Sequence, residues 1–321
     1  MKPLVILTGP TAVGKTKLSI ELAKAINAEI ISADSMQVYK HMDIGTAKIK
    51  QDEMEGVKHY LIDEFDPKEE FNVVKFQKYA KQYMEDIYLR GKIPLIVGGT
   101  GFYIQSIIKD VDFTENDADT TYRKELEQLA SEKGATYLHE MLARVDEQSA
   151  KAIHENNVKK VIRALEFYQQ TGQKISEHNL EQSEKSSPYN FAYFVLNDDR
   201  EKLYERIDLR IDEMLAQGLI DEVAHLREMG YSRELVSMQG LGYKEILAYL
   251  DGECSLDEAI YILKRDTRHF AKRQLTWFKR EQNVTWVEKD KYNYDTKKIL
   301  EFMLEHLAPI LGKDHTNERV I

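Results

Sequence analysis

The residues best suited to chemistry lie near the amino terminus, in a run that matches the pattern GxxxxGK[ST]. Glycines in such a run let the backbone curl until successive amides point at one anion, and the helix that follows adds the positive end of its dipole. The lysine then reaches the terminal phosphates, and the threonine hydroxyl can bind Mg²⁺. The run predicts a polyphosphate site, whose expected ligands are Gly9, Pro10, Thr11, Ala12, Val13, Gly14, Lys15 and Thr16.

A second chemical signal is an acidic residue at the end of a predicted strand. Nucleotide-hydrolysing proteins with this loop hold magnesium through an aspartate that follows a second apolar strand. Here the best such strand, residues 94–97, ends in Gly-Gly-Thr, and the acidic strand end is Asp34, after residues 29–33 (EIISA). The guanine-reading sequence Asn-Lys-x-Asp is absent from the chain. We therefore expect a group transfer near Asp34 rather than ordinary nucleotide hydrolysis.

The elements that must position these residues alternate between short apolar strands and amphipathic helices. Such alternation is typical of a parallel sheet covered by helices, so the expected fold class is α/β. The predicted strands are residues 4–7, 29–33, 94–97, 191–196 and 284–287, and the predicted helices of this part are residues 15–27, 74–90 and 256–282.

Between these elements the chain changes character. Residues 114–187 are polar and have no convincing strand, but helices are expected near residues 121–133, 137–145 and 158–170. We interpret this stretch as a mainly helical insertion domain. The remaining residues, 1–113 and 188–321, then form the core domain that carries the phosphate loop.

The composition limits the class of protein. A chain of 321 residues with 42% apolar and 31% charged residues can bury a sizeable core, which excludes a mostly disordered protein. No apolar run approaches the roughly 18 residues of a membrane-spanning helix, and no secretory signal is recognisable. A single cysteine, Cys254, excludes an intrachain disulfide and a multi-cysteine zinc site. We expect a cytoplasmic protein that does not bind membranes.

Charge is distributed unevenly along the chain. The net charge of −10 argues against a nucleic-acid binder, but residues 264–280 hold seven basic residues, one acidic residue and interleaved aromatics. Most charge runs are merely solvated faces, so this run alone does not decide between the two readings. Lys159, Lys160 and Arg163 form a second small cluster, to which Arg123 adds.

Seven segments together resemble those of the bacterial tRNA dimethylallyltransferase family, whose members are also called IPP transferases. They run in order across most of the chain, and each segment except the phosphate loop would be weak alone. The segments are residues 9–16, 34–39 (DSMQVY), 42–48 (MDIGTAK), 97–101 (VGGTG), 162–166 (IRALE), 239–245 (QGLGYKE) and 272–277 (KRQLTW).

The resemblance implies a fold and a reaction. It implies a P-loop kinase-like sheet, with a helical insertion that grips the tRNA anticodon stem-loop. The implied reaction moves a dimethylallyl group from dimethylallyl diphosphate to the N6 amine of the adenosine immediately 3′ of the anticodon, in tRNAs that read codons starting with U. Mg²⁺ is the implied cofactor, and we expect the enzyme to act as a monomer.

The resemblance also implies roles for single residues. Asp34 is the expected general base, because an adenine amine must lose its proton as the new bond forms. Lys15, Mg²⁺ on Thr16 and Arg210 are expected to stabilise the leaving diphosphate, with Arg206 as the substitute for Arg210. The residues expected to contact tRNA are Asp34, Ser35, Met36, Gln37, Thr100, Arg123, Lys159, Lys160, Val161, Ile162, Arg163, Gln239, Gly240, Leu241, Gly242, Tyr243, Lys244, Lys272 and Arg273.

Two other functions stay open at this point. The phosphate loop alone fits ATP equally well, so a small-molecule or nucleoside kinase is the main alternative. A non-catalytic RNA-binding ATPase is the other. The chain also departs from the family at Lys159 and Lys160, where paired arginines are common, so bidentate phosphate contacts are in doubt there.

Overall fold

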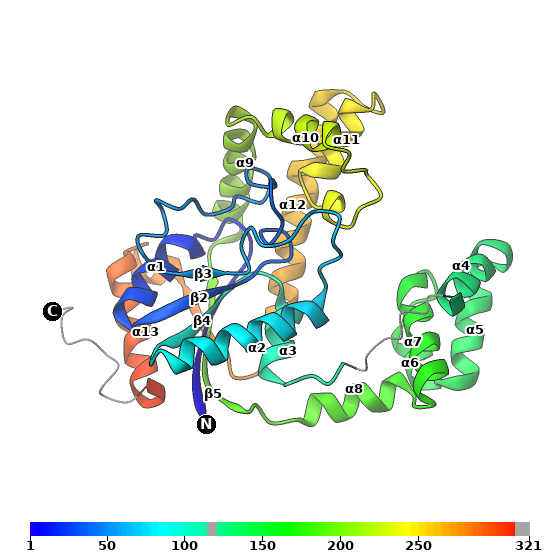
Figure 1. The fold of residues 1–321 in the computed structure, drawn as a ribbon, viewed down its shortest axis with the longest axis horizontal. Coiled ribbons are helices and arrows are strands. Elements are labelled where there is room, and N and C mark those ends of the chain that lie inside the picture. The colour runs from blue at the N-terminus through cyan, green and yellow to red at the C-terminus, as the bar shows by residue number, and fades with distance from the viewer. Residues whose placement is uncertain (114–120, 312–321) are drawn as a thin grey trace. The chain divides into compact units, whose positions relative to one another are not determined.

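The structure is a computed structural model that describes residues 1–113 and 121–311 (Figure 1). Residues 114–120, with which the expected insertion domain begins, and the tail 312–321 lie outside the described residues. The chain forms two compact units. One comprises Met1–Ile108 and Pro188–Ile321, and the other comprises Lys109–Ser187.

The larger unit is built on a six-stranded sheet in which every pairing is parallel, in the order β3-β2-β4-β1-β5-β6. Its middle strands are covered on both faces, which explains why they read as continuous apolar runs. The α/β fold class predicted from the alternation is confirmed. The strands are β1 Lys2–Thr8, β2 Ala28–Ala33, β3 His59–Tyr60, β4 Ile93–Gly98, β5 Tyr189–Asn197 and β6 Thr285–Glu288.

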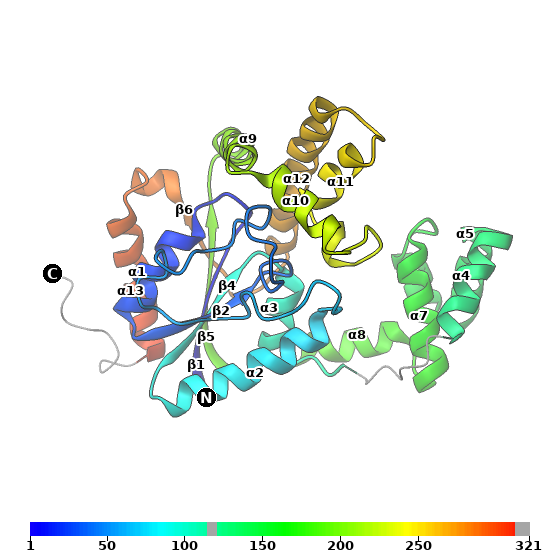
Figure 2. The same ribbon diagram turned by 45° about the horizontal axis from the view of Figure 1, so that its top comes forward.

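Helices cover the two faces of this sheet. Helix α1 (Lys15–Ala25) packs with α13 (Thr296–Leu311), and α2 (Val73–Leu89) packs with α3 (Gly101–Ile108). In both ribbon views the first pair lies on one side of the sheet and the second pair on the other (Figures 1 and 2). Helix α1 ends two residues before the predicted boundary, because Asn27 takes a left-handed conformation with φ of 53°.

A second group of helices stands beyond the carboxyl ends of the strands (Figure 2). Helix α12 is the longest of the described helices, and it packs against α9, α11 and α3. It ends at Phe278, four residues before the predicted end. The elements of this part are α9 Arg200–Ala216, α10 Leu219–Glu228, η1 Ser237–Gln239, α11 Tyr243–Leu250, α12 Leu256–Phe278 and η2 Lys289–Tyr292.

The smaller unit is entirely helical in its described residues, and it has its own apolar core. Buried Asp146 ties two of its helices together. Asp146 is the N-cap of α6, and its carboxylate accepts hydrogen bonds from the backbone and hydroxyl of Ser149 in that helix. It also accepts hydrogen bonds from the backbone and hydroxyl of Ser176 in α8, and all four distances are 2.7–3.0 Å. The helices are α4 Thr121–Lys133, α5 Ala135–Val145, α6 Glu147–Ala152, α7 Val158–Thr171 and α8 Ile175–Glu184.

None of the helices in the described residues has both the length and the apolar character that crossing a bilayer requires.

Candidate active site

The phosphate loop joins β1 to α1. Gly9 approaches β5 so closely that a Cβ there would lie 2.5 Å from the carbonyl oxygen of Leu196, and Gly14 has a left-handed φ of 92°. Gly14 is the N-cap of α1 and supplies no side-chain cap. Because the first amides of a helix have no intrahelical acceptor, the start of α1 is left able to bind an anion.

Lys15 folds back over this loop. Its ammonium donates to the carbonyl oxygens of Gly9 at 2.9 Å and Pro10 at 2.8 Å. Burial, together with the nearby positive charge of Arg210, lowers the pKa of Lys15 to about 7, and Asp34 partly offsets both effects. A bound polyanion would favour the charged form of this lysine.

Two cavities adjoin above the carboxyl ends of β1, β2 and β4. The first, of about 440 Å³, lies over the phosphate loop and is bordered by Lys15, Thr16 and Glu213. The second, of about 330 Å³, extends between α9, α11 and α12. Both are bordered by Thr11, Ala12, Asp34, Thr46, Arg210, Phe270 and Gln274.

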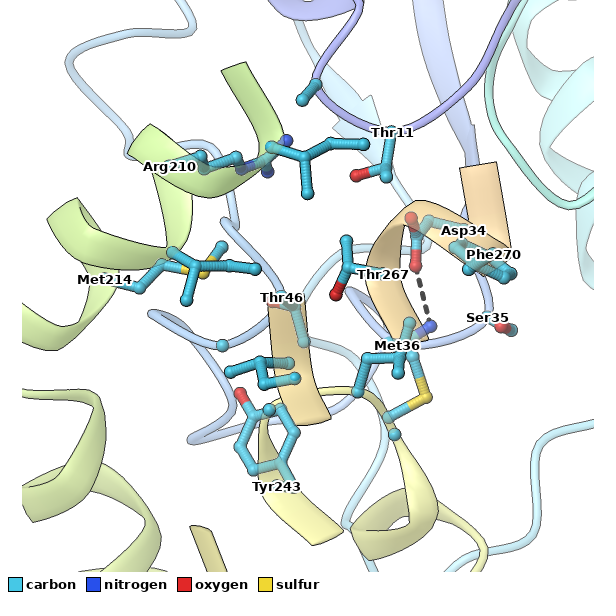
Figure 3. A pocket seen from close by; sticks show the side chains of 18 of the residues that line it. Thr11, Asp34, Ser35, Met36, Thr46, Arg210, Met214, Tyr243, Thr267 and Phe270 are labelled. Atoms are coloured by element: carbon cyan, nitrogen blue, oxygen red, sulfur yellow. Dashed lines mark hydrogen bonds between the residues drawn. The ribbon is translucent and has the colours of Figure 1, made fainter. Parts of the chain in front are cut away.

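The second cavity combines polar and apolar lining residues. Thr11, Asp34 and Arg210 lie at one end of it, and Tyr243 lies at the other (Figure 3). Apolar side chains line the space between, at helical spacing along α9 and α12. They are Ile207, Ile211, Met214, Leu263 and Phe270. The charged group and the apolar group of a phosphorylated apolar molecule would both find complementary lining residues here.

Asp34 follows the last residue of β2. One of its oxygens accepts a hydrogen bond from the amide of Met36 at 2.8 Å (Figure 3). The same oxygen accepts one from the amide of Gln37 at 3.3 Å, and the two bonds hold the carboxylate in place. The other oxygen, Oδ2, has no hydrogen-bond partner in the described part of the chain. The residue thus forms the turn that its sequence position allows and also presents a carboxylate oxygen to both cavities.

The structure separates Arg210 from its expected substitute. Arg206 pairs with the fully buried carboxylate of Asp198, which also accepts a hydrogen bond from Tyr294. For Arg210 no carboxylate lies within ion-pair distance in residues 1–113 and 121–311. Burial lowers the pKa of Arg210, and Asp34 and Glu213 partly offset this effect. Arg210 borders both cavities, so it is better placed to meet a ligand's charge.

The residues after Asp34 divide between the cavities and the loop itself. Ser35 and Met36 border the second cavity. Gln37 borders the first cavity, and its side-chain amide also fixes the loop by donating to the carbonyl oxygens of Thr46 at 3.2 Å and Ala47 at 3.3 Å. Thr100 borders the second cavity, and its backbone amide donates to the carbonyl oxygen of Ala33 at 3.1 Å.

All of the segment from Gln239 to Lys244 borders the second cavity, and it is held there by a carboxylate that the sequence did not reveal. Glu222 of α10 accepts hydrogen bonds from the backbone amides of Asp43, Ile44 and Gly45 at 2.7–3.1 Å, and from the hydroxyl of Tyr243 at 2.7 Å. The expected contact residues here are Gln239, Gly240, Leu241, Gly242, Tyr243 and Lys244. Glu222 therefore joins two segments that are far apart in the chain, 42–48 and 239–245.

The basic run on α12 is less free than its composition suggested. Lys264 and Arg268 pair with Asp212 and Asp208 of α9, at 2.6 Å in each case, and Arg265 pairs with Asp266. Four of the seven basic residues remain exposed without such a pair in the described residues, namely Lys272, Arg273, Lys279 and Arg280. The basic surface is thus confined to the carboxyl half of the helix.

In the helical unit, the residues expected to contact RNA differ in exposure. Lys159, Lys160 and Arg163 are exposed on α7, but the side chains of Val161 and Ile162 are buried in the unit's core. A contact of Val161 or Ile162 with RNA would therefore be made through the backbone, and it stays a prediction. The two side chains face inward because apolar residues at helical spacing form the packed side of α7.

Arg123 of the same unit has a protein partner. Its guanidinium forms a forked pair with Glu166, with nitrogen–oxygen distances of 2.9–3.1 Å. Residues 114–120 and 312–321 apart, the chain has no group of three or more histidine, cysteine, aspartate or glutamate side chains that could hold a metal ion.

Comparison with known proteins agrees with the geometry. The family model described as IPP transferase matches residues 37–281. A tRNA dimethylallyltransferase of Lachnoclostridium phytofermentans is 67% identical over 303 residues, which cover 94% of this chain and 97% of the relative. One of Acetivibrio thermocellus is 54% identical, with 96% and 98% covered.

Solved structures show the same likeness. The tRNA isopentenylpyrophosphate transferase of Bacillus halodurans matches with a TM-score of 0.72 and 45% identity, over 96% of this chain and 98% of the other. A eukaryotic dimethylallyltransferase solved in the course of acting on tRNA matches with a TM-score of 0.82 and 30% identity, over 100% and 87%. The fold, the site and these relatives agree, and the chain belongs to the IPP transferase family.

Proposed function

We propose that this protein is a tRNA dimethylallyltransferase. It moves the dimethylallyl group of dimethylallyl diphosphate to the N6 amine of the adenosine immediately 3′ of the anticodon, in tRNAs that read codons starting with U, and releases diphosphate. The observation that carries the proposal is the junction of a phosphate cavity with a partly apolar cavity at Asp34 and Arg210. A kinase needs the first cavity, whereas a prenyl donor uses both.

The leaving diphosphate is stabilised by the residues around the phosphate loop. Charge grows on the diphosphate as its bond to carbon breaks, and donors already aimed at that position need no reorganisation. The first amides of α1, the ammonium of Lys15 and the guanidinium of Arg210 are placed for this task. Arginine suits the role because its planar fork bonds two phosphate oxygens at once.

Asp34 takes the proton from the adenine amine. The amine is a weak nucleophile because its lone pair is delocalised into the ring, so its proton must leave as the bond to carbon forms. Asp34 borders both cavities where they adjoin, and its oxygen Oδ2 is left to accept the proton there, where the donor carbon and the adenine amine would meet. The target adenosine lies in a loop of the tRNA, so the free energy needed to unstack it is small.

Mg²⁺ fits this site without a dedicated cage of ligands. It usually keeps several waters and binds one or two carboxylates together with substrate phosphates. The hydroxyl of Thr16 and the carboxylates of Asp34 and Glu213 border the cavity where those phosphates would lie. Bound there, the ion would neutralise charge on the diphosphate.

The tRNA is contacted from both units. In the helical unit, Lys159, Lys160 and Arg163 offer exposed charge to the anticodon stem-loop. In the larger unit, Lys272 and Arg273 offer charge on α12, and the segment from Gln239 to Lys244 reaches the target base. We infer that the enzyme acts as a monomer in the cytoplasm, where its tRNA substrates are found.

The test is a transfer assay with purified protein, Mg²⁺, labelled dimethylallyl diphosphate and an unmodified tRNA that reads a U-starting codon. We expect label at N6 of the named adenosine and none in a tRNA whose adenosine is replaced by guanosine. A parallel reaction with ATP tests the kinase alternative. Phosphoryl transfer from ATP that is indifferent to tRNA, with no labelled base, would overturn the proposal.

A further inference from the structure

The glycines of the segment 97–101 (VGGTG) are required by space rather than by backbone conformation. A Cβ at Gly98 would lie 2.3 Å from the carbonyl oxygen of Ala33, and one at Gly99 would lie 2.2 Å from Nε2 of Gln274. One at Gly101 would lie 2.2 Å from the ring of Trp277. The segment therefore packs closely against two other elements. It contacts the end of β2 and also helix α12, through two α12 residues that lie one turn apart.

Gln274 does more than pack against this segment. Its side-chain oxygen accepts a hydrogen bond from the amide of Thr11 at 2.9 Å, and its side-chain nitrogen donates to the carbonyl oxygen of Gly99 at 3.0 Å. The residue is 7% exposed, so water does not compete well for these bonds. Only a side chain with both a donor and an acceptor satisfies both loops, and glutamine provides both.

The two loops that Gln274 joins position the two groups of the proposed reaction, the diphosphate and the carboxylate of Asp34. Thr11 belongs to the phosphate loop, and its amide is committed to Gln274 rather than to a ligand. Gly99 precedes Thr100, whose amide bonds to Ala33, the residue before Asp34. One side chain thus stands between the diphosphate site and the strand end that carries the carboxylate.

We propose that Gln274 is a positioning residue that sets the separation of the phosphate loop from Asp34. The inference rests on the proposed function, because the diphosphate held by the loop and the amine deprotonated by Asp34 must lie on opposite sides of the reacting carbon. Displacement of a reacting group by about 1 Å can lower a rate about 10²-fold. Gln274 also borders both cavities, but its side-chain oxygen and nitrogen bond to Thr11 and Gly99, so we expect it to act through these two loops.

The first test replaces Gln274 with methionine, which has a similar shape but neither hydrogen bond. We expect kcat to fall about 10²-fold and the Kd of inorganic diphosphate with Mg²⁺ to rise about tenfold, which corresponds to about 1.4 kcal/mol. The Kd of tRNA should stay the same, because Lys272 and Arg273 are intact. Gln282→Met is the matched control, since Gln282 is exposed just beyond the helix, and it should behave as the wild type.

A purely structural role would give a different result. It would lower the melting temperature of Gln274→Met while the folded protein kept its diphosphate Kd and its kcat, and that outcome would overturn the inference. Diphosphate binding is measured without any tRNA or prenyl donor. A wild type that binds diphosphate but transfers nothing would therefore contradict the proposed function. The diphosphate Kd of the wild type and of Gln274→Met could still be compared.

A second variant approaches the same contact from the other side. Gly99→Ala places a methyl group against the flexible end of Gln274, so the fold should survive while the two hydrogen bonds are lost. We expect it to reproduce both effects of Gln274→Met. In a Gln274→Ala background it should add little, because its target is gone. Full additivity of the two substitutions would overturn the inference.

Discussion

The basic residues of this protein fall into two regions that use the same charge in opposite ways. Around the phosphate loop, Lys15 and Arg210 are partly buried, and loss of solvation lowers the pKa of each. On the carboxyl half of α12 and on α7, the lysines and arginines are exposed to water. A buried cation costs free energy until a ligand arrives, whereas an exposed one costs almost nothing and is screened by salt.

This difference predicts separate roles for the two regions, catalysis in the first and electrostatic attraction of tRNA in the second. Charges in the first region should govern the rate, the pH dependence and the affinity for diphosphate. Charges in the second should govern tRNA affinity and its response to ionic strength. Substitutions in one region should leave the other property nearly unchanged, and each prediction below tests that separation.

The largest effect is expected at the carboxylate between the cavities. An asparagine side chain at this position would still accept the bonds from the amides of Met36 and Gln37, so Asp34→Asn keeps the turn but removes the base. We expect kcat to fall by roughly 10²–10⁴, with the tRNA Kd within about twofold of the wild type. Single-turnover transfer and filter binding measure the two quantities. Near-normal turnover would show that another group takes the proton.

Removing Arg210 should have the next largest effect. Arg210→Ala loses a proposed donor to the leaving group, and loss of such a donor typically lowers kcat by roughly 10²–10³. Its melting temperature should be unchanged or higher, because the substitution removes a desolvated cation. The matched variant Arg206→Ala should instead lower the melting temperature, since it deprives the buried carboxylate of Asp198 of its cation. The opposite pattern would assign the diphosphate to Arg206.

The pH dependence of donor binding is a sharper test of the buried region. With a pKa of about 7 in the free protein, Lys15 is mostly neutral above pH 7. A bound diphosphate raises that pKa, so binding takes up a proton, and affinity should fall by up to about tenfold per pH unit above 7. Calorimetry in buffers of different ionisation enthalpy would measure the proton. Lys15→Arg, which stays charged, should take up none, and equal uptake by both proteins would contradict the assignment.

How much of this could be predicted from sequence depends on the range of the contacts. The phosphate loop is contiguous, and the middle strands are apolar runs, so local pattern was enough for both. Glu222 and Gln274 act across 178 and 263 positions of the chain, and a single sequence carries no signal of such pairs. The buried side of α7 could be predicted from the sequence, because Val161 and Ile162 follow the apolar spacing of that helix.

Charge neutralisation was hidden for the same reason. Counting residues 264–280 gave a strongly basic helix, but Asp208 and Asp212 lie far away in the chain. Their spacing of four residues matches that of Lys264 and Arg268, so two successive turns of α9 and α12 face each other. A count of charges along one helix cannot show which of them another helix has already paired.

The difference between paired and unpaired basic residues of α12 leads to the smallest predicted effect, which concerns the salt dependence of tRNA binding. Replacing Lys272 and Arg273 with alanine removes two exposed charges, each of which contributes roughly 0.7–0.9 to the slope of log K against log salt. We expect the slope to fall by about 1.4–1.8 and kcat at saturating tRNA to change little. Binding titrations between 50 and 200 mM salt, roughly the range over which such slopes are resolved, provide the measurement.

The control uses the same charges on the same helix. Replacing Lys264 and Arg268 with alanine also removes two positive charges, but these are already neutralised by α9. The salt slope should therefore stay within error of the wild type, and any loss should be seen in the melting temperature. If both double variants lower the slope equally, tRNA binding depends on the total charge of α12. Pairing with α9 would then not determine which basic residues contact the tRNA, and the prediction would be contradicted.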